Sequence, residues 1–143
     1  MTIRNMDTYI KNLWDFGFIE RELPGKCAVS DLDGVIERNG QFLVIETKSP
    51  GAKVPMGQAI MFSALQKLDS FTVVVIYGKP EHVEKMRVWP EQSKMAGNVE
   101  FLKFVSEWWN RVDAMPRPSM SLPVSVKKEK RIMTFNRGGN DNG

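Results

Sequence analysis

Acidic, basic and amide side chains gather in the part of the chain between Asp31 and Gln58. Asp31 and Asp33 alternate along one segment, and Glu46 and Lys48 alternate along a second. Because alternate side chains of a β-strand share a face, each pair would point to one side of its strand. If the two segments form a hairpin, four charged groups meet on one small surface. Such a cluster is suited to hydrolysing a phosphodiester bond with the help of a divalent cation.

The acidic residues are the expected metal ligands. Asp33 and Glu46 would bind Mg²⁺, which usually takes one or two protein carboxylates and keeps several waters. The backbone carbonyl of Ile45 or Thr47 could add a ligand, and Asp31 is an auxiliary ligand for a second ion. The sequence does not decide between one ion and two.

Lys48 and Gln58 are the expected partners of the metal ligands. Lys48 would orient or deprotonate the attacking water, or stabilise the negative charge of the transition state, and both roles remain open. Gln58 lies at the start of an expected helix, where an anion is favoured. It would donate a hydrogen bond to a phosphate or interact with a metal-bound water.

The elements that must position these residues are predicted from the surrounding pattern. Asn39-Gly40 is a tight-turn signal between two β-forming segments, which predicts a hairpin with Asp31 and Asp33 on its first arm. A helix is expected from Pro55, and the apolar run 71–77 predicts a buried strand beside the second arm of the hairpin. The fold class is therefore α/β, with a central mixed sheet, made of the hairpin and a crossover strand, flanked by helices.

Three further elements are expected around this core. Residues 6–21 predict a first helix, with a break at Gly17 left open, and residues 83–89 predict a short strand that ends at Pro90. Residues 99–112 predict a closing helix. Pro116 and Pro118 mark the end of the core, so residues 1–118 form one domain.

Residues 119–143 are expected to be a flexible basic tail. The chain has 143 residues and a formal net charge of +3, and the basic excess lies in this tail. Its composition is that of a mobile arm, and its basic cluster is either a solvated run or a DNA contact. The cluster consists of Lys127, Lys128, Lys130 and Arg131.

Several function classes are excluded by composition. Cys27 and His82 are the single cysteine and the single histidine, which excludes a disulfide framework, a zinc site and a serine-histidine triad. No apolar run approaches the length of about 20 residues that a membrane helix needs. The N-terminal residues are too polar for a secretory signal. We therefore expect a protein of the cytoplasm without a membrane partner.

The spacing of the charged residues resembles a known family. Asp33, followed thirteen residues later by Glu46-Thr47-Lys48, is similar to the PD-(D/E)xK nuclease superfamily, with Leu32 where proline is usual. Gln58, ten residues after Lys48, resembles the virus-type replication-repair nuclease branch (VRR-NUC) and small phage enzymes. The resemblance covers residues 8–112.

This resemblance implies a restriction-endonuclease-like core and one or two Mg²⁺ or Mn²⁺ ions. It also implies that the substrate is DNA, cut at branches, flaps or ends rather than at a specific sequence, in the host cytoplasm if a phage encodes the chain. Glu20 is the counterpart of an acidic residue on the first helix that assists the metal site in some members. Lys53 and Arg38 are candidate phosphate contacts.

Other interpretations remain open. The segment from Ala28 to Ile36 also resembles the first motif of haloacid-dehalogenase-type phosphatases, in which Asp31 would be the nucleophile and Asp33 its partner. A second alternative is a DNA-binding module of the nuclease fold without cleavage. A homodimer is a further expectation, based on the small size of the chain and on Trp108-Trp109. Trp89 is the tryptophan left as a candidate for base stacking.

Overall fold

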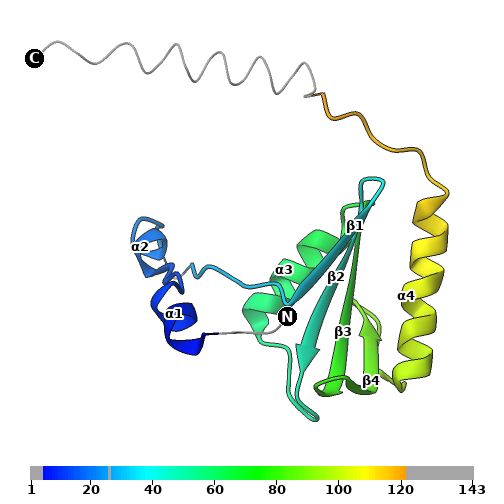
Figure 1. The fold of residues 1–143 in the computed structure, drawn as a ribbon, viewed down its shortest axis with the longest axis horizontal. Coiled ribbons are helices and arrows are strands. Elements are labelled where there is room, and N and C mark those ends of the chain that lie inside the picture. The colour runs from blue at the N-terminus through cyan, green and yellow to red at the C-terminus, as the bar shows by residue number, and fades with distance from the viewer. Residues whose placement is uncertain (1–4, 26, 122–143) are drawn as a thin grey trace, which may run out of the picture.

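A sheet with helices on both faces forms the body of the protein (Figure 1). The computed structural model describes residues 5–25 and 27–121. The sheet has five strands in the order β1-β2-β3-β4-β5. Their bounds are β1 (Gly34–Arg38), β2 (Gln41–Lys48), β3 (Phe71–Lys79), β4 (His82–Val88) and β5 (Lys94–Met95). The helices are α1 (Met6–Lys11), α2 (Gly17–Glu20), α3 (Met56–Gln66) and α4 (Asn98–Asp113).

The predicted hairpin is confirmed, with one correction to its first arm. Asn39 and Gly40 both have positive φ, at 51° and 79°, as a tight two-residue turn requires. β1 and β2 pair antiparallel, with Gly34 opposite Ile45. However, β1 begins at Gly34, so Asp31 and Asp33 precede the strand instead of lying on it. Aspartate is disfavoured in strands because its carboxylate competes for backbone donors, and Asp33 makes such a bond here.

The crossover from β2 through α3 to β3 is confirmed. β3 lies parallel to β2, with Glu46 opposite Val75 and Lys48 opposite Tyr77. Such a parallel pair needs a long connection, which α3 provides. Pro55 is the residue that precedes the helix, one position earlier than its expected place as the first helical residue.

Each face of the sheet has its own apolar core. α4 covers one face, where Trp108 and Val112 pack with Leu43, Val74 and Met86. α3 covers the other, where Phe62 is fully buried among other side chains. These are Val44, Val73, Val75 and Trp89. Consecutive residues of β2 and β3 thus face opposite cores, which is why both strands read as continuous apolar runs.

The strand predicted over 83–89 is β4, and α4 matches the predicted closing helix within one residue at each end. The two-residue β5 was not predicted. Trp89 is not an exposed stacking platform, because it is 6% exposed and packs edge-on against Phe62. Its indole N–H donates to Ser63 Oγ at 3.0 Å, which satisfies its one polar group inside the core.

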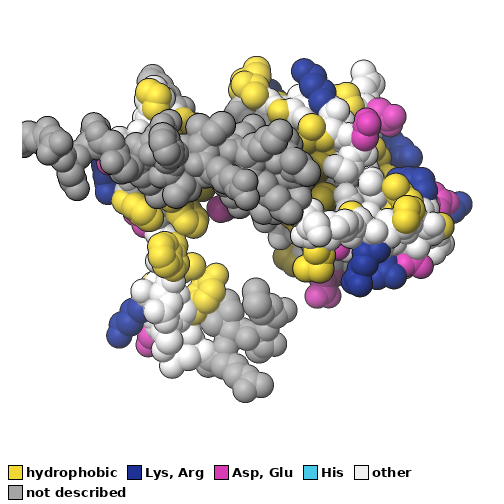
Figure 2. All heavy atoms as spheres, turned by 90° about the horizontal axis from the view of Figure 1, so that it is seen from above, with side chains coloured by type: hydrophobic (Ala, Val, Ile, Leu, Met, Phe, Trp, Pro, Cys, Tyr) yellow, Lys and Arg dark blue, Asp and Glu magenta, His cyan; other side chains and the backbone are white. Residues whose placement is uncertain are grey.

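The N-terminal part departs from the helix expected over 6–21, for which a break at Gly17 was left open, because the interruption precedes Gly17, the first residue of α2. It forms two short helices separated by residues 12–16. Asn12 donates its side-chain amide to the Thr8 carbonyl, and Asp15 accepts the Gly17 N–H, so local side-chain bonds replace the helical ladder. Neither helix buries a residue, and Trp14 is 75% exposed. Figure 2 shows hydrophobic side chains on the surface of this part, which stands apart from the sheet.

Among the helices of residues 5–25 and 27–121, none has the length and apolarity that crossing a bilayer would take.

Candidate functional site

Glu46 is the centre of the candidate site. It lies near the end of β2 on the face that α3 covers, in alternation with Val44, and it is 4% exposed. Among the described residues it is the one buried charged side chain. Gln58 lies in the first turn of α3, directly over this position, and its amide donates to Glu46 Oε1 at 2.9 Å. The crossover connection therefore brings together two residues twelve positions apart in the sequence.

Lys48 shares the face of Glu46 because the two residues are separated by one position on β2. Its Nζ lies 3.4 Å from Glu46 Oε1, and its side chain is 16% exposed. One carboxylate oxygen therefore interacts with both an ammonium and an amide. Burial of this ion pair strengthens its Coulomb attraction compared with a pair in water.

Two buried oxygens at this site have no donor. Glu46 Oε2 and Gln58 Oε1 lack a hydrogen-bond partner in the described structure. Leaving such a buried group unpaired costs about 1 to 3 kcal/mol, and more when the group is charged. A carboxylate oxygen and an amide oxygen are also hard ligands of the kind that Mg²⁺ prefers. The residues present therefore fit a divalent cation in their chemistry.

Asp33 lies on the side of β2 that pairs with β1, directly before the first residue of β1. Its Oδ2 accepts the backbone N–H of Thr47 and the Thr47 hydroxyl, both at 2.8 Å. The side chain thus continues the hydrogen bonding of β1 and β2 by one step beyond Gly34. The expectation that the Thr47 carbonyl is a metal ligand stays a prediction, because the contacts with Asp33 use only the N–H and the hydroxyl of Thr47. The contact engages Oδ2 alone.

The remaining candidates lie elsewhere. Asp31 is exposed and precedes β1, and no three His, Cys, Asp or Glu side chains within the described ranges form a metal-binding group. Glu20 accepts the Val29 N–H at 3.0 Å, which is a local contact of the N-terminal part. Lys53 is exposed in the loop between β2 and α3. Arg38 pairs with Asp113 at the far end of β2.

The basic cluster of the tail, Lys127, Lys128, Lys130 and Arg131, lies outside the residues that the structure describes.

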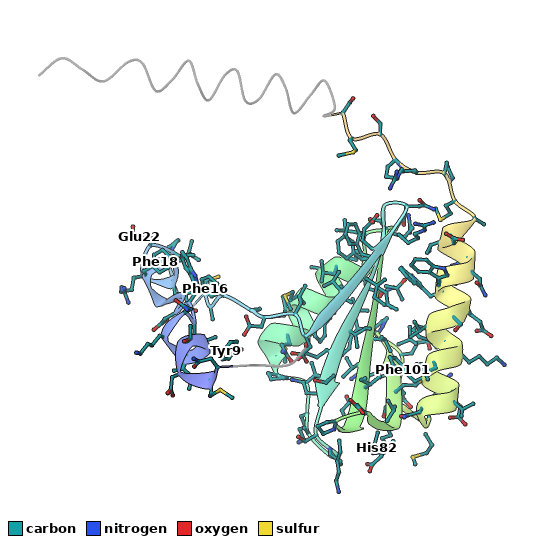
Figure 3. The ribbon with its side chains drawn as sticks, viewed as in Figure 1. Tyr9, Phe16, Phe18, Glu22, His82 and Phe101 are labelled. Atoms are coloured by element: carbon teal, nitrogen blue, oxygen red, sulfur yellow. The ribbon has the colours of Figure 1, made fainter. Side chains whose placement is uncertain are left out.

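A cavity of about 670 Å³ opens at the end of the sheet near the start of α4. His82 and Phe101, labelled in Figure 3, lie at this end and line the cavity. Thr47 also lines it, whereas Glu46, Lys48 and Gln58 do not. The cavity therefore belongs to the α4 side of the sheet, whereas Glu46, Lys48 and Gln58 lie on the α3 side.

The phosphatase alternative is not supported by the placement of Asp31. In the phosphatase motif that this segment resembles, the nucleophile stands at the end of an apolar strand. Residues 27–33 form no strand, and Asp31 is exposed.

Comparisons with protein families, with curated proteins and with solved structures found no match to the chain.

Proposed function

We propose that the chain is a Mg²⁺-dependent nuclease that hydrolyses phosphodiester bonds in DNA, with Glu46 at its centre. The observation that carries this proposal is the buried Glu46 carboxylate, one oxygen of which has no donor, together with an unpaired oxygen of Gln58, whose amide bonds to the same carboxylate. A buried carboxylate oxygen without a donor costs free energy even when the other oxygen is paired, and buried ionisable groups are concentrated at functional sites.

The two oxygens without donors, Glu46 Oε2 and Gln58 Oε1, are the candidate ligands of the cation. Asp33 remains a proposed ligand through the oxygen that Thr47 does not use, although its bond to the Thr47 hydroxyl lies toward the α4 side of the sheet, away from Glu46. When bound, a divalent cation polarises the phosphoryl oxygen and makes a water molecule a better nucleophile. Mn²⁺ takes similar ligands and would substitute for Mg²⁺.

Lys48 contributes the positive charge of the site. Its ammonium lies on the same face as the Glu46 carboxylate and retains access to solvent. From there it would bind a non-bridging phosphate oxygen and stabilise the negative charge that develops during attack. Gln58 holds Glu46 Oε1 through its amide, which fixes the rotamer of the carboxylate.

The substrate class rests on the resemblance to PD-(D/E)xK nucleases. It favours DNA with branches, flaps or ends over a specific sequence. Lys53, exposed in the loop after Lys48, is a candidate phosphate contact close to the site in sequence. A homodimer that grips two duplex arms remains part of this proposal.

The test is a cleavage assay on branched, flapped and linear DNA with Mg²⁺ or Mn²⁺. We expect Lys48→Ala to slow cleavage by about 10² to 10³-fold, as for the loss of one electrostatic stabiliser. Lys103→Ala is the matched control, because Lys103 is an exposed lysine on α4. Equal rates for the parent and Lys48→Ala would refute the mechanism. DNA binding without cleavage by any preparation would favour the binding-module alternative.

A further inference from the structure

The register of the sheet places a row of side chains beside Glu46. Lys48 lies opposite Tyr77, Tyr77 lies opposite Lys85, and Lys85 lies opposite Met95. Directly opposite residues on neighbouring strands point to the same face. The row therefore crosses β2, β3, β4 and β5 at right angles to the strands, and Lys48, at one end of it, contacts Glu46.

The row lies on the α3 face of the sheet but at the margin of what α3 covers. Tyr77 packs against the apolar cluster of that face. In the adjoining row, Glu46 and the opposite Val75 are both buried. Exposure rises along the row away from Glu46, since Lys48 and Tyr77 are half-buried, Lys85 is exposed and Met95 is 77% exposed. Solvent therefore has access to a strip that begins at the site and runs to the edge of the sheet.

The basic groups of this region differ in their availability. Arg87, in the row of Glu46, is already engaged, because its guanidinium stacks on Trp89 at 4.1 Å and its Nε donates to the Glu91 carbonyl. Lys85 has no carboxylate within salt-bridge distance in the described part of the chain. The row thus offers two lysines about 10 Å apart, as expected for positions two strands apart, with an aromatic ring between them.

We propose that Lys48, Tyr77, Lys85 and Met95 form a track that binds a single-stranded segment of DNA and leads it to Glu46. Lysines that alternate with an aromatic and an apolar side chain match the alternation of phosphates and bases along a strand. A base stacks on the Tyr77 ring only when it is unpaired, which selects a single strand over a duplex. This inference rests on the proposed function and specifies its substrate as a flap or a frayed end.

The test measures binding and not cleavage, so that its result is separate from that of the nuclease assay. A labelled single-stranded oligonucleotide is titrated with the full chain in a metal chelator, and fluorescence anisotropy is recorded at several salt concentrations. Lys85→Ala should weaken binding and lower the magnitude of the salt slope by about 0.7, the value for one phosphate contact on a single strand. Lys85→Arg should restore both.

Lys94→Ala is the matched control. Lys94 is also exposed and lies on the neighbouring strand β5, but it is opposite Met86 and so points to the α4 face. Its substitution should leave binding unchanged. Tyr77→Leu should weaken binding about tenfold, the scale of one lost base stack, while Tyr77→Phe should not. Circular dichroism of the two Tyr77 variants checks that the sheet is intact.

Three results would overturn the track. They are equal effects of Lys85→Ala and Lys94→Ala, no binding of single strands by the parent, and an equal effect of Lys85→Ala on a blunt duplex. If the track variants behave as expected but no DNA is ever cut with Mg²⁺, the track stands as a binding site and the proposed nuclease activity fails.

Discussion

The two ends of β2 carry polar clusters with opposite character. At the turn that precedes β2, Asn39 donates its amide to the carbonyls of Val112 and Met115, at 3.1 and 2.9 Å, and so caps the C-terminal end of α4. Arg38 binds Asp113 through Nε at 2.7 Å and lies over the Trp109 ring. At the other end, the Glu46 site leaves two buried oxygens without donors.

We interpret this difference as one between polar groups that stabilise the fold and polar groups that are kept for the proposed function. The turn cluster uses its donors to join the hairpin to α4, and it lies at the surface, where water can satisfy what remains. The Glu46 site is buried and keeps an ion pair and two oxygens without donors, where a fully apolar set of side chains would pack at least as well. A polar group that costs stability where it lies is expected to serve another purpose.

The largest expected effect is that of Glu46→Gln. Cleavage should fall to background because the charged ligand is lost. Stability should change by less than about 1 kcal/mol, because the new amide offers a donor to Gln58 Oε1 while the ion pair with Lys48 is lost. Denaturant unfolding and the cleavage assay measure the two quantities. A less stable variant that still cleaves would show that Glu46 belongs with the structural cluster.

Asp33→Asn should cause the second-largest loss of cleavage rate. Asparagine keeps an oxygen that can accept the Thr47 donors, so the fold should persist. Cleavage should nevertheless fall about 100-fold, the upper range for loss of a group that orients or supports a metal ligand. Thr47→Val is the control, because it removes the hydroxyl alone and should lower stability by about 1 kcal/mol with a smaller loss of rate. The opposite order would make Asp33 a purely structural residue.

Much of the fold could be predicted because its signals are local. Asn39-Gly40 fixes the turn of the hairpin, and the turn fixes the pairing register of β1 and β2. A shift of this register by one residue would move every side chain of a strand to the opposite face of the sheet. The apolar runs of β2 and β3 predicted strands buried on both faces. The grouping of Glu46, Lys48 and Gln58 follows from this register and from the crossover helix.

The errors arose where tertiary contacts decide. Trp89 follows a short strand and precedes a proline, a position that suggests a loop, yet the ring is buried by Phe62 and Ser63 from α3. Asp33 alternates with Asp31 as strand residues do, but its carboxylate bonds to Thr47 and the strand starts later. The row through Lys85 requires the pairing of β3 with β4, whose register shifts at Tyr77/Gly78 in a way that sequence does not reveal.

Asn39→Ala should have the largest effect on stability within the turn cluster. It removes the cap of α4 and places an alanine at φ 51°, and together these changes should cost about 2 to 3 kcal/mol. Asn39→Gly is the matched variant, because glycine tolerates the conformation and loses only the hydrogen bonds. It should cost about 1 kcal/mol less. Thermal unfolding measures both, and the cleavage rate of the folded protein should remain that of the parent. A selective loss of rate would connect the turn to the site and break the division between the two ends.

Arg38→Ala should have the smallest effect of these substitutions. It tests whether the turn end of β2 has any part in binding DNA. The Arg38 and Asp113 side chains are 43% and 44% exposed, so the ion pair and the contact with Trp109 together should be worth about 1 kcal/mol or less. Because the guanidinium is engaged by Asp113, we expect Arg38→Ala to leave DNA affinity and its salt dependence unchanged. Lys53→Ala, at the opposite end of β2, should reduce the salt dependence of binding to DNA. If Arg38→Ala reduces it instead, the turn end of β2 contacts phosphate, and the DNA path must extend along the strand instead of crossing it.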